Sequence, residues 1–153
     1  MSNNDNNVKL YNILIPLWWL WLFPMTWVIV ISGNFIIDNL ILIISMVVLK
    51  MENKKQWYKR YIFKIFAFDI LSEIFGAWFM FLMLFVLDPK GWDMDELYVT
   101  IPGLILSAVL IFAFNYKYTF KKIDKVLRFR LSIIFMVFST PYAFLVPSNW
   151  LYW

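Results

Sequence analysis

The sequence predicts an all-α fold, a polytopic bundle of transmembrane helices. Of the 153 residues, 63% are hydrophobic and only 16% are charged, and the mean hydropathy is +0.71. A soluble domain of this length could not bury so much apolar surface. The apolar residues also gather in runs long enough to cross a bilayer, which takes about 20 residues per helix. The lipid bilayer is therefore the first partner that the composition predicts.

The amino terminus is polar and rich in asparagine over residues 1–10, which predicts a disordered cytoplasmic tail. The remainder, residues 11–153, is predicted to form a single transmembrane helical domain. The first apolar run continues to Met51 without a small-residue cleavage site, so we expect no cleaved signal peptide.

The first apolar run, residues 11–51, is too long for one straight span. As a single helix it would measure about 60 Å, twice the thickness of the hydrocarbon core. Its strongest turn signal is Ser32–Gly33–Asn34, which predicts a hairpin of two spans, residues 11–31 and 34–50. Each half then has roughly the length that a membrane crossing requires.

A second interpretation of the same run keeps one tilted span over residues 25–51. Residues 11–24, which contain Pro16 and Pro24, would then form an interfacial or re-entrant segment. The hairpin is favoured because both of its halves meet the spanning length on their own.

Three further apolar runs follow, separated by polar loops. The loop at residues 88–96 contains Pro89 and Gly91 and is strongly acidic, which is typical of a turn in water. Gly103 and Ser107 lie four residues apart, a spacing that favours close helix contact, although a chance pair explains it equally well. The predicted spans are 11–31, 34–50, 61–87, 97–115 and 131–147, five in all, or four with the interfacial segment.

Lysine and arginine predict the orientation, because basic loops remain in the cytoplasm. Segments 50–64 and 116–130 each contain six of these residues, whereas segment 88–97 contains one. Both basic loops are therefore predicted to be cytoplasmic. The chain has eleven lysines against three arginines, which weakly indicates an AT-rich bacterial genome and hence the bacterial inner membrane.

The second basic segment, residues 116–130, has a helical period. Tyr116, Phe120, Ile123 and Leu127 recur at that spacing, which is typical of an amphipathic helix on anionic lipid headgroups. A simple topology signal is the favoured alternative. Nucleic acid is not expected as a partner, since the net charge of +4 is spread over two membrane-proximal loops. The cations predicted to face the lipid are Lys117, Lys121, Lys122, Lys125 and Arg128.

Acidic residues inside the apolar runs are the candidate functional site, because charges in hydrocarbon are costly and commonly functional. Asp69, Ser72 and Glu73 share one helical face at spacings of three and four. Counting from the cytoplasmic loop places Asp38 and Glu73 at the same depth, about 17 Å from the boundary. The predicted polar seam between the two facing spans comprises Asn34, Asp38, Ser45, Asp69, Ser72 and Glu73.

The predicted polar seam has acids but no lysine or arginine at its depth. A carboxyl group placed there is protonated, binds a mobile cation or meets a cationic partner. We therefore expect the chain to bind or conduct a proton or small cation. Protonated acids acting only as hydrogen-bonding contacts between helices are the competing structural explanation, at roughly equal weight.

Catalysis is not expected, and neither is a cofactor or a metal centre. The chain has no cysteine and no histidine, which removes thiol nucleophiles and the commonest base and metal ligand. It also lacks a P-loop and the Gly-x-Gly-Asp pattern of presenilin-like aspartyl proteases. The alternative function is a non-catalytic membrane subunit or immunity-type protein that docks a larger membrane complex; a homo-oligomer is also open.

Overall fold

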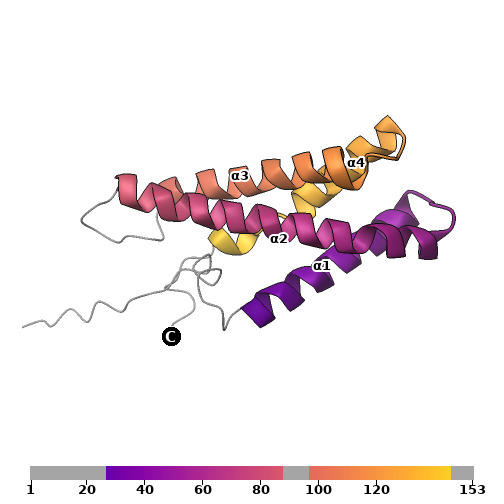
Figure 1. The fold of residues 1–153 in the computed structure, drawn as a ribbon, viewed down its shortest axis with the longest axis horizontal. Helices are drawn as coiled ribbons and strands as arrows, with labels where there is room; N and C mark the ends of the chain where they lie inside the picture. Colours follow the sequence, from indigo (N-terminus) through magenta and orange to yellow (C-terminus); the bar gives the residue numbers. More distant parts are fainter. Residues whose placement is uncertain (1–26, 88–96, 146–153) are drawn as a thin grey trace, which may run out of the picture.

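The computed structural model describes residues 27–87 and 97–145, and in this part of the chain helices joined by short turns are the only secondary-structure elements. Helix α2 packs against α1 on one side and α3 on the other, while α4 contacts both α1 and α3 (Figure 1). The elements are α1 (Trp27–Val48), α2 (Lys54–Leu87), α3 (Leu97–Phe114), the π-helical turn η3 (Asn115–Thr119), α4 (Lys125–Phe138) and the 3-10 turn η4 (Tyr142–Leu145).

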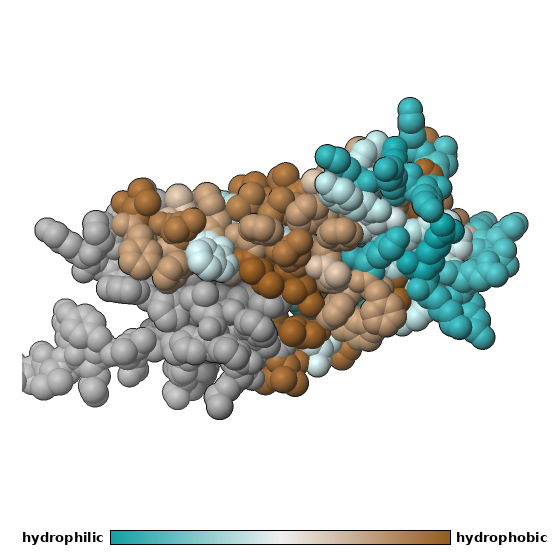
Figure 2. Space-filling view, viewed as in Figure 1, coloured by the Kyte–Doolittle hydropathy of each residue, from teal (hydrophilic) through white to brown (hydrophobic). Residues whose placement is uncertain are grey.

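Three of the described helices, α1, α2 and α3, are long and apolar enough to cross a membrane. Hydrophobic side chains cover the middle of the bundle in Figure 2, and hydrophilic ones gather at the end where the α1–α2 loop and the α3–α4 turn lie. The prediction of an all-α fold is confirmed for the described residues, and the length and composition of these three helices agree with the predicted membrane spans.

The predicted turn at Ser32–Gly33–Asn34 is wrong, because α1 runs through all three residues. Gly33 is helical, with open space where a Cβ would lie, and the Asn34 side chain contacts α2. These polar residues therefore mark a helix contact rather than a chain reversal. The described part of α1 agrees with the second interpretation, one span over residues 25–51. The tail and residues 11–26 lie outside the described residues.

The predicted fifth span, residues 131–147, is not a continuous helix where the structure describes it. Helix α4 has 14 residues, which gives about 21 Å against a hydrocarbon core of about 30 Å. Pro141 follows two residues after Ser139 and disfavours helix in the residue before it. The chain continues as η4 instead, so the described residues contain three helices long and apolar enough to span a membrane, and they do not confirm five spans.

The basic segment 116–130 is not one amphipathic helix, so that prediction is wrong. The segment bends after η3. Asp124 then caps the start of α4, where its Oδ2 accepts a hydrogen bond from the Val126 backbone amide at 3.0 Å. Phe120, which was predicted to face lipid, is fully buried against Tyr61 and Phe135. The apolar face of this segment is therefore covered by the protein itself, whereas Lys117, Lys121, Lys122 and Lys125 are exposed and Arg128 is half-buried.

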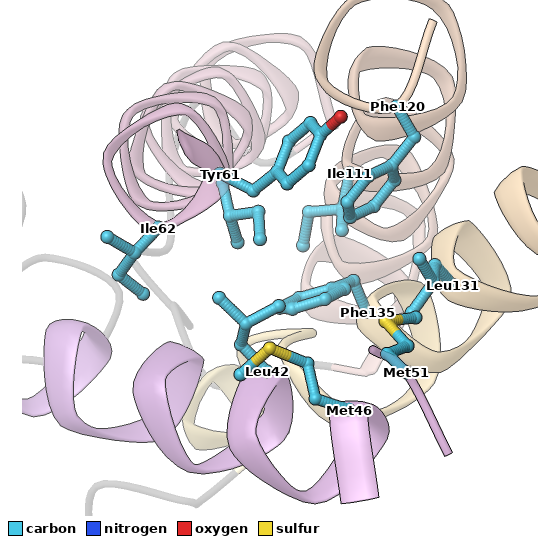
Figure 3. Close-up of a cluster of buried hydrophobic side chains, with 10 residues drawn as sticks. Leu42, Met46, Met51, Tyr61, Ile62, Ile111, Phe120, Leu131 and Phe135 are labelled. Atoms are coloured by element: carbon cyan, nitrogen blue, oxygen red, sulfur yellow. The ribbon is translucent and has the colours of Figure 1, made fainter. Parts of the chain in front are cut away.

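A hydrophobic core joins the four helices near the loop end (Figure 3). Leu42 and Met46 come from α1, and Ile111 from α3, while Leu131 and Phe135 come from α4. A second buried cluster, built around Met80 and Val99, lies between α2 and α3, farther from the α1–α2 loop and the α3–α4 turn. The first core holds the short α4 against the spanning helices, with its carboxyl end directed into the bundle.

Helices α2 and α3 approach closely at Gly76, Gly103 and Ser107. A Cβ atom on Gly76 would lie 1.8 Å from Ser107 Oγ and 3.1 Å from the Gly103 carbonyl oxygen. A Cβ atom on Gly103 would lie 2.3 Å from Met80 Cγ. The small residues at 103 and 107 therefore serve the close helix contact that their spacing suggested.

Gly76→Ala should lower the free energy of unfolding by about 1–3 kcal/mol, the usual cost of overpacking a close contact. Unfolding by denaturant in detergent micelles or bilayer discs measures the change. Gly33→Ala is the matched control on a spanning helix, because no atom lies within 4 Å of its added Cβ. A Gly76 variant as stable as the Gly33 variant would contradict the packing described here.

Candidate functional site

Four polar side chains from four different elements meet inside the bundle, and we call them the carboxyl cluster. Asp38 comes from α1, Asp69 from α2, Asn115 from the start of η3, and Ser139 from the residue that ends α4. The exposed fractions of the two acids are 0% and 1%, so neither reaches the surface of the described bundle.

Ser139 joins the two acids. Its Oγ lies 2.6 Å from Asp38 Oδ1 and 2.8 Å from Asp69 Oδ2. A serine hydroxyl carries a single proton, so it donates to one carboxylate at a time. The second short contact is a hydrogen bond only if that carboxyl group is itself protonated and donates to the serine oxygen. The geometry therefore suits a pair of acids that holds one proton between them.

Asn115 fixes the far side of Asp69. Its Nδ2 donates to Asp69 Oδ1 at 2.8 Å, so both oxygens of that carboxyl group are engaged. Two other oxygens of the carboxyl cluster, Asp38 Oδ2 and Asn115 Oδ1, are buried without a hydrogen-bond partner among the described residues. Both oxygens can accept a hydrogen bond or ligate a cation. Leaving a buried acceptor without a partner costs about 1–3 kcal/mol.

No fixed positive charge bonds to the carboxyl cluster within the described residues. Among the described residues, the side chains that hydrogen-bond to Asp38 and Asp69 are those of a serine and an asparagine. Every described lysine and arginine lies in segment 50–64 or 117–130, and the nearest along α2, Lys64, is exposed. Two buried acids without a basic partner favour a proton or a mobile cation as the compensating charge.

The carboxyl end of α4 adds to this preference. Ser139 ends the helix, and its backbone amide bonds to the Phe135 carbonyl at 2.8 Å. The last carbonyl groups of a helix carry a partial negative charge, which attracts cations. A helix that ends inside a membrane bundle beside carboxyl groups is an arrangement that transporters use to hold cations.

A second polar contact lies one helical turn away. Asn34 Nδ2 donates to Glu73 Oε2, linking α1 to α2. Asn34 lies four residues before Asp38, and Glu73 lies four residues after Asp69. The two antiparallel helices thus place the Asn34–Glu73 pair directly beside the carboxyl cluster along the bundle axis.

The predicted depth match between Asp38 and Glu73 differs from the structure by one helical turn, since Asp38 meets Asp69 instead. The predicted match places the cytoplasmic end of this helix near residue 61, whereas α2 begins at Lys54 and the connection from α1 is short. Lys50 and Asn53 adopt φ angles of 49° and 53° to close it. Because the connection is short, Asp69 lies opposite Asp38. Asp69 is nearer to the α1–α2 loop than Glu73 is.

The two predicted serines contribute less than the acids. Ser72 is buried on the predicted face, but its hydroxyl donates to the Phe68 carbonyl of its own helix at 2.7 Å. Ser45 is also buried, seven residues from Asp38 towards the α1–α2 loop. The structure therefore brings together Asp38 with Asp69 and Asn34 with Glu73.

Sequence reasoning missed Asn115 and Ser139, the two neutral members of the carboxyl cluster. Asn115 lies at the edge of the predicted span 97–115, where a polar residue indicates only the end of the apolar run. Ser139 stood inside another predicted span, although Ser139–Thr140–Pro141 interrupts that apolar run. Such a helix-breaking signal in the middle of an apolar run is the feature that could have indicated a helix end inside the membrane.

Comparisons with known protein families, with curated proteins and with solved structures find no match to this chain. Within the described residues there is no group of three or more His, Cys, Asp or Glu side chains that could hold a metal ion. The chemistry of the carboxyl cluster therefore has to be argued from its own geometry.

Proposed function

We propose that this protein binds a proton or a small monovalent cation at the carboxyl cluster and passes it through the membrane. The observation that carries the proposal is the contact of one serine hydroxyl with two buried acids, at 2.6 and 2.8 Å, with no basic partner in the described part of the chain. The unpaired oxygens of Asp38 and Asn115 support it, because they offer further ligands or proton acceptors.

In this mechanism Asp38 and Asp69 exchange one proton through the Ser139 hydroxyl, which can accept from one acid while it donates to the other. A cation that enters takes the oxygens of both carboxylates as ligands, and the proton that it displaces passes to the next carboxylate along the bundle. Glu73 is the next carboxyl group along the bundle, one turn from Asp69, and would act as the following station, with Asn34 orienting it.

Flux measured in liposomes that contain only the purified protein tests the proposal. We expect a proton gradient, followed with a trapped pH-sensitive dye, to collapse faster than in empty liposomes. Parallel vesicles with a sodium or potassium gradient identify the transported ion. Liposomes that stay as tight as protein-free ones to all three ions would reject the proposal and favour the non-catalytic subunit or immunity-type protein that docks a larger complex.

We further propose that the basic loops face the cytoplasm of a bacterial cell and that the acidic segment 88–96 faces outward. The asymmetry of lysine and arginine supports this orientation. Because the chain has no natural cysteine, single Asn53→Cys and Lys121→Cys variants should react with a membrane-impermeant thiol reagent only after permeabilisation. Met94→Cys should react in intact cells, and protection of Met94→Cys would reverse the orientation.

A further inference from the structure

A cavity of about 390 Å³ opens at the loop end of the bundle, between the start of α2 and the α3–α4 turn. It lies in the region where hydrophilic side chains gather in Figure 2. Along α2 it is separate from the carboxyl cluster, since its lining residue Arg60 precedes Asp69 by nine residues, or about 13 Å. The cavity is therefore a separate site from the carboxyl cluster.

The lining of this cavity combines two cations with neutral donors. Arg60 comes from α2 and Lys122 from the turn before α4, so the fold brings together charges that are far apart in the sequence. Asn53 and Gln56 add side-chain amides. The one acid in the lining, Asp124, already uses Oδ2 to cap α4 at the Val126 amide. The balance of the lining is positive.

Two aromatic rings complete the wall. Trp57 and Tyr61 lie with ring centroids 4.9 Å apart, and the Arg60 guanidinium lies 5.7 Å from the centroid of the Tyr61 ring. Tryptophan and tyrosine concentrate at the level of lipid headgroups. The cavity therefore has the make-up of a site at the membrane interface, where phosphate groups are abundant.

We propose that this cavity binds a phosphate group, carried either by an anionic phospholipid headgroup or by a soluble phosphate. The planar guanidinium of Arg60 suits two phosphate oxygens at once, and the Lys122 ammonium supplies a second charge. The amides of Asn53 and Gln56 can donate to the remaining oxygens. This proposal stands independently of ion movement through the carboxyl cluster.

The test uses the full chain in a maltoside detergent, which contains no phosphate. Binding of phosphatidylglycerol is measured by native mass spectrometry, and binding of inorganic phosphate by isothermal titration. We expect the double variant Arg60→Gln/Lys122→Gln to bind the effective probe at least about tenfold more weakly, since one charged hydrogen bond is worth that much. If one probe binds, or binds more tightly, it identifies the source of the phosphate.

The matched control is Lys54→Gln/Lys121→Gln, which removes the same charge from the same end of the protein but from residues that do not line the cavity. We expect less than a threefold change for this variant. Equal weakening by both double variants would show that general positive charge attracts the probe, and failure of the wild-type protein to bind either probe would equally overturn the proposal. All four substituted side chains are exposed, and circular dichroism checks that each variant folds.

Discussion

Asp69→Asn should lower ion flux by about 100-fold or more while the protein remains folded. Asparagine keeps the shape of the side chain and can still contact Ser139 and Asn115. It cannot, however, release a proton or carry the negative charge that attracts a cation. Removing a titrating group from a proton-transfer step commonly costs two to four orders of magnitude. Flux in liposomes, compared at equal amounts of reconstituted protein, measures the loss.

Ser72→Ala is the control for Asp69→Asn, because Ser72 is buried on the same face of α2 but bonds to a carbonyl of its own helix. Its flux should stay close to wild type. Infrared spectra in lipid give an independent readout, since a shared proton predicts a carboxyl C=O band at neutral pH. That band should disappear in Asp38→Asn/Asp69→Asn. Full flux in Asp69→Asn would remove the carboxyl cluster from the transport path.

The acids of the polar seam were predictable, because a single acid within a long apolar run already indicates a side chain that faces the interior of the bundle. Asp38, Asp69 and Glu73 stand out in apolar runs, and all three are buried. Helical spacing then correctly placed Asp69 and Glu73 on one face of α2. These inferences needed only the local period of a helix, which the sequence contains in full.

The partners of those acids depend on information that no local pattern holds. Ser139 contacts Asp38 at a sequence separation of 101 residues, and its position depends on where α4 ends. The register between α1 and α2 depends on the backbone angles of a short loop. The observed pairing of acids therefore differs from the predicted one by one helical turn. Contacts between helices follow from tertiary packing, and packing is decided by the whole bundle.

The error at Ser32–Gly33–Asn34 has a related physical cause. Glycine and asparagine are turn signals in water because they free or replace backbone hydrogen bonds. In a bilayer there is no water to satisfy an opened backbone, so a spanning helix continues through such residues. Asn34 then finds its partner on the neighbouring helix, Glu73. A turn signal inside a long apolar run is therefore better interpreted first as a helix contact.

Ser139→Ala should lower both stability and flux, because its hydroxyl is the link between two buried acids. Loss of a hydrogen bond to a charged group costs about 1.5–3 kcal/mol, and both Asp38 and Asp69 lose a partner at once. We therefore expect the free energy of unfolding to fall by about 2–3 kcal/mol. Flux should fall as well, since the proton loses its bridge between the acids. Denaturant unfolding and liposome assays measure the two effects.

Ser132→Ala is the matched control for this prediction, because Ser132 is a buried serine on the same helix. Its hydroxyl donates to the Arg128 carbonyl at 2.8 Å, within α4 itself. Replacing such a side chain should change stability by less than about 1 kcal/mol and leave flux intact. Ser139→Thr, which keeps a hydroxyl at the same place, should recover part of both losses. If the alanine variants at 139 and 132 behave alike, the Ser139 hydroxyl does not join Asp38 to Asp69, and the proton has no path between them.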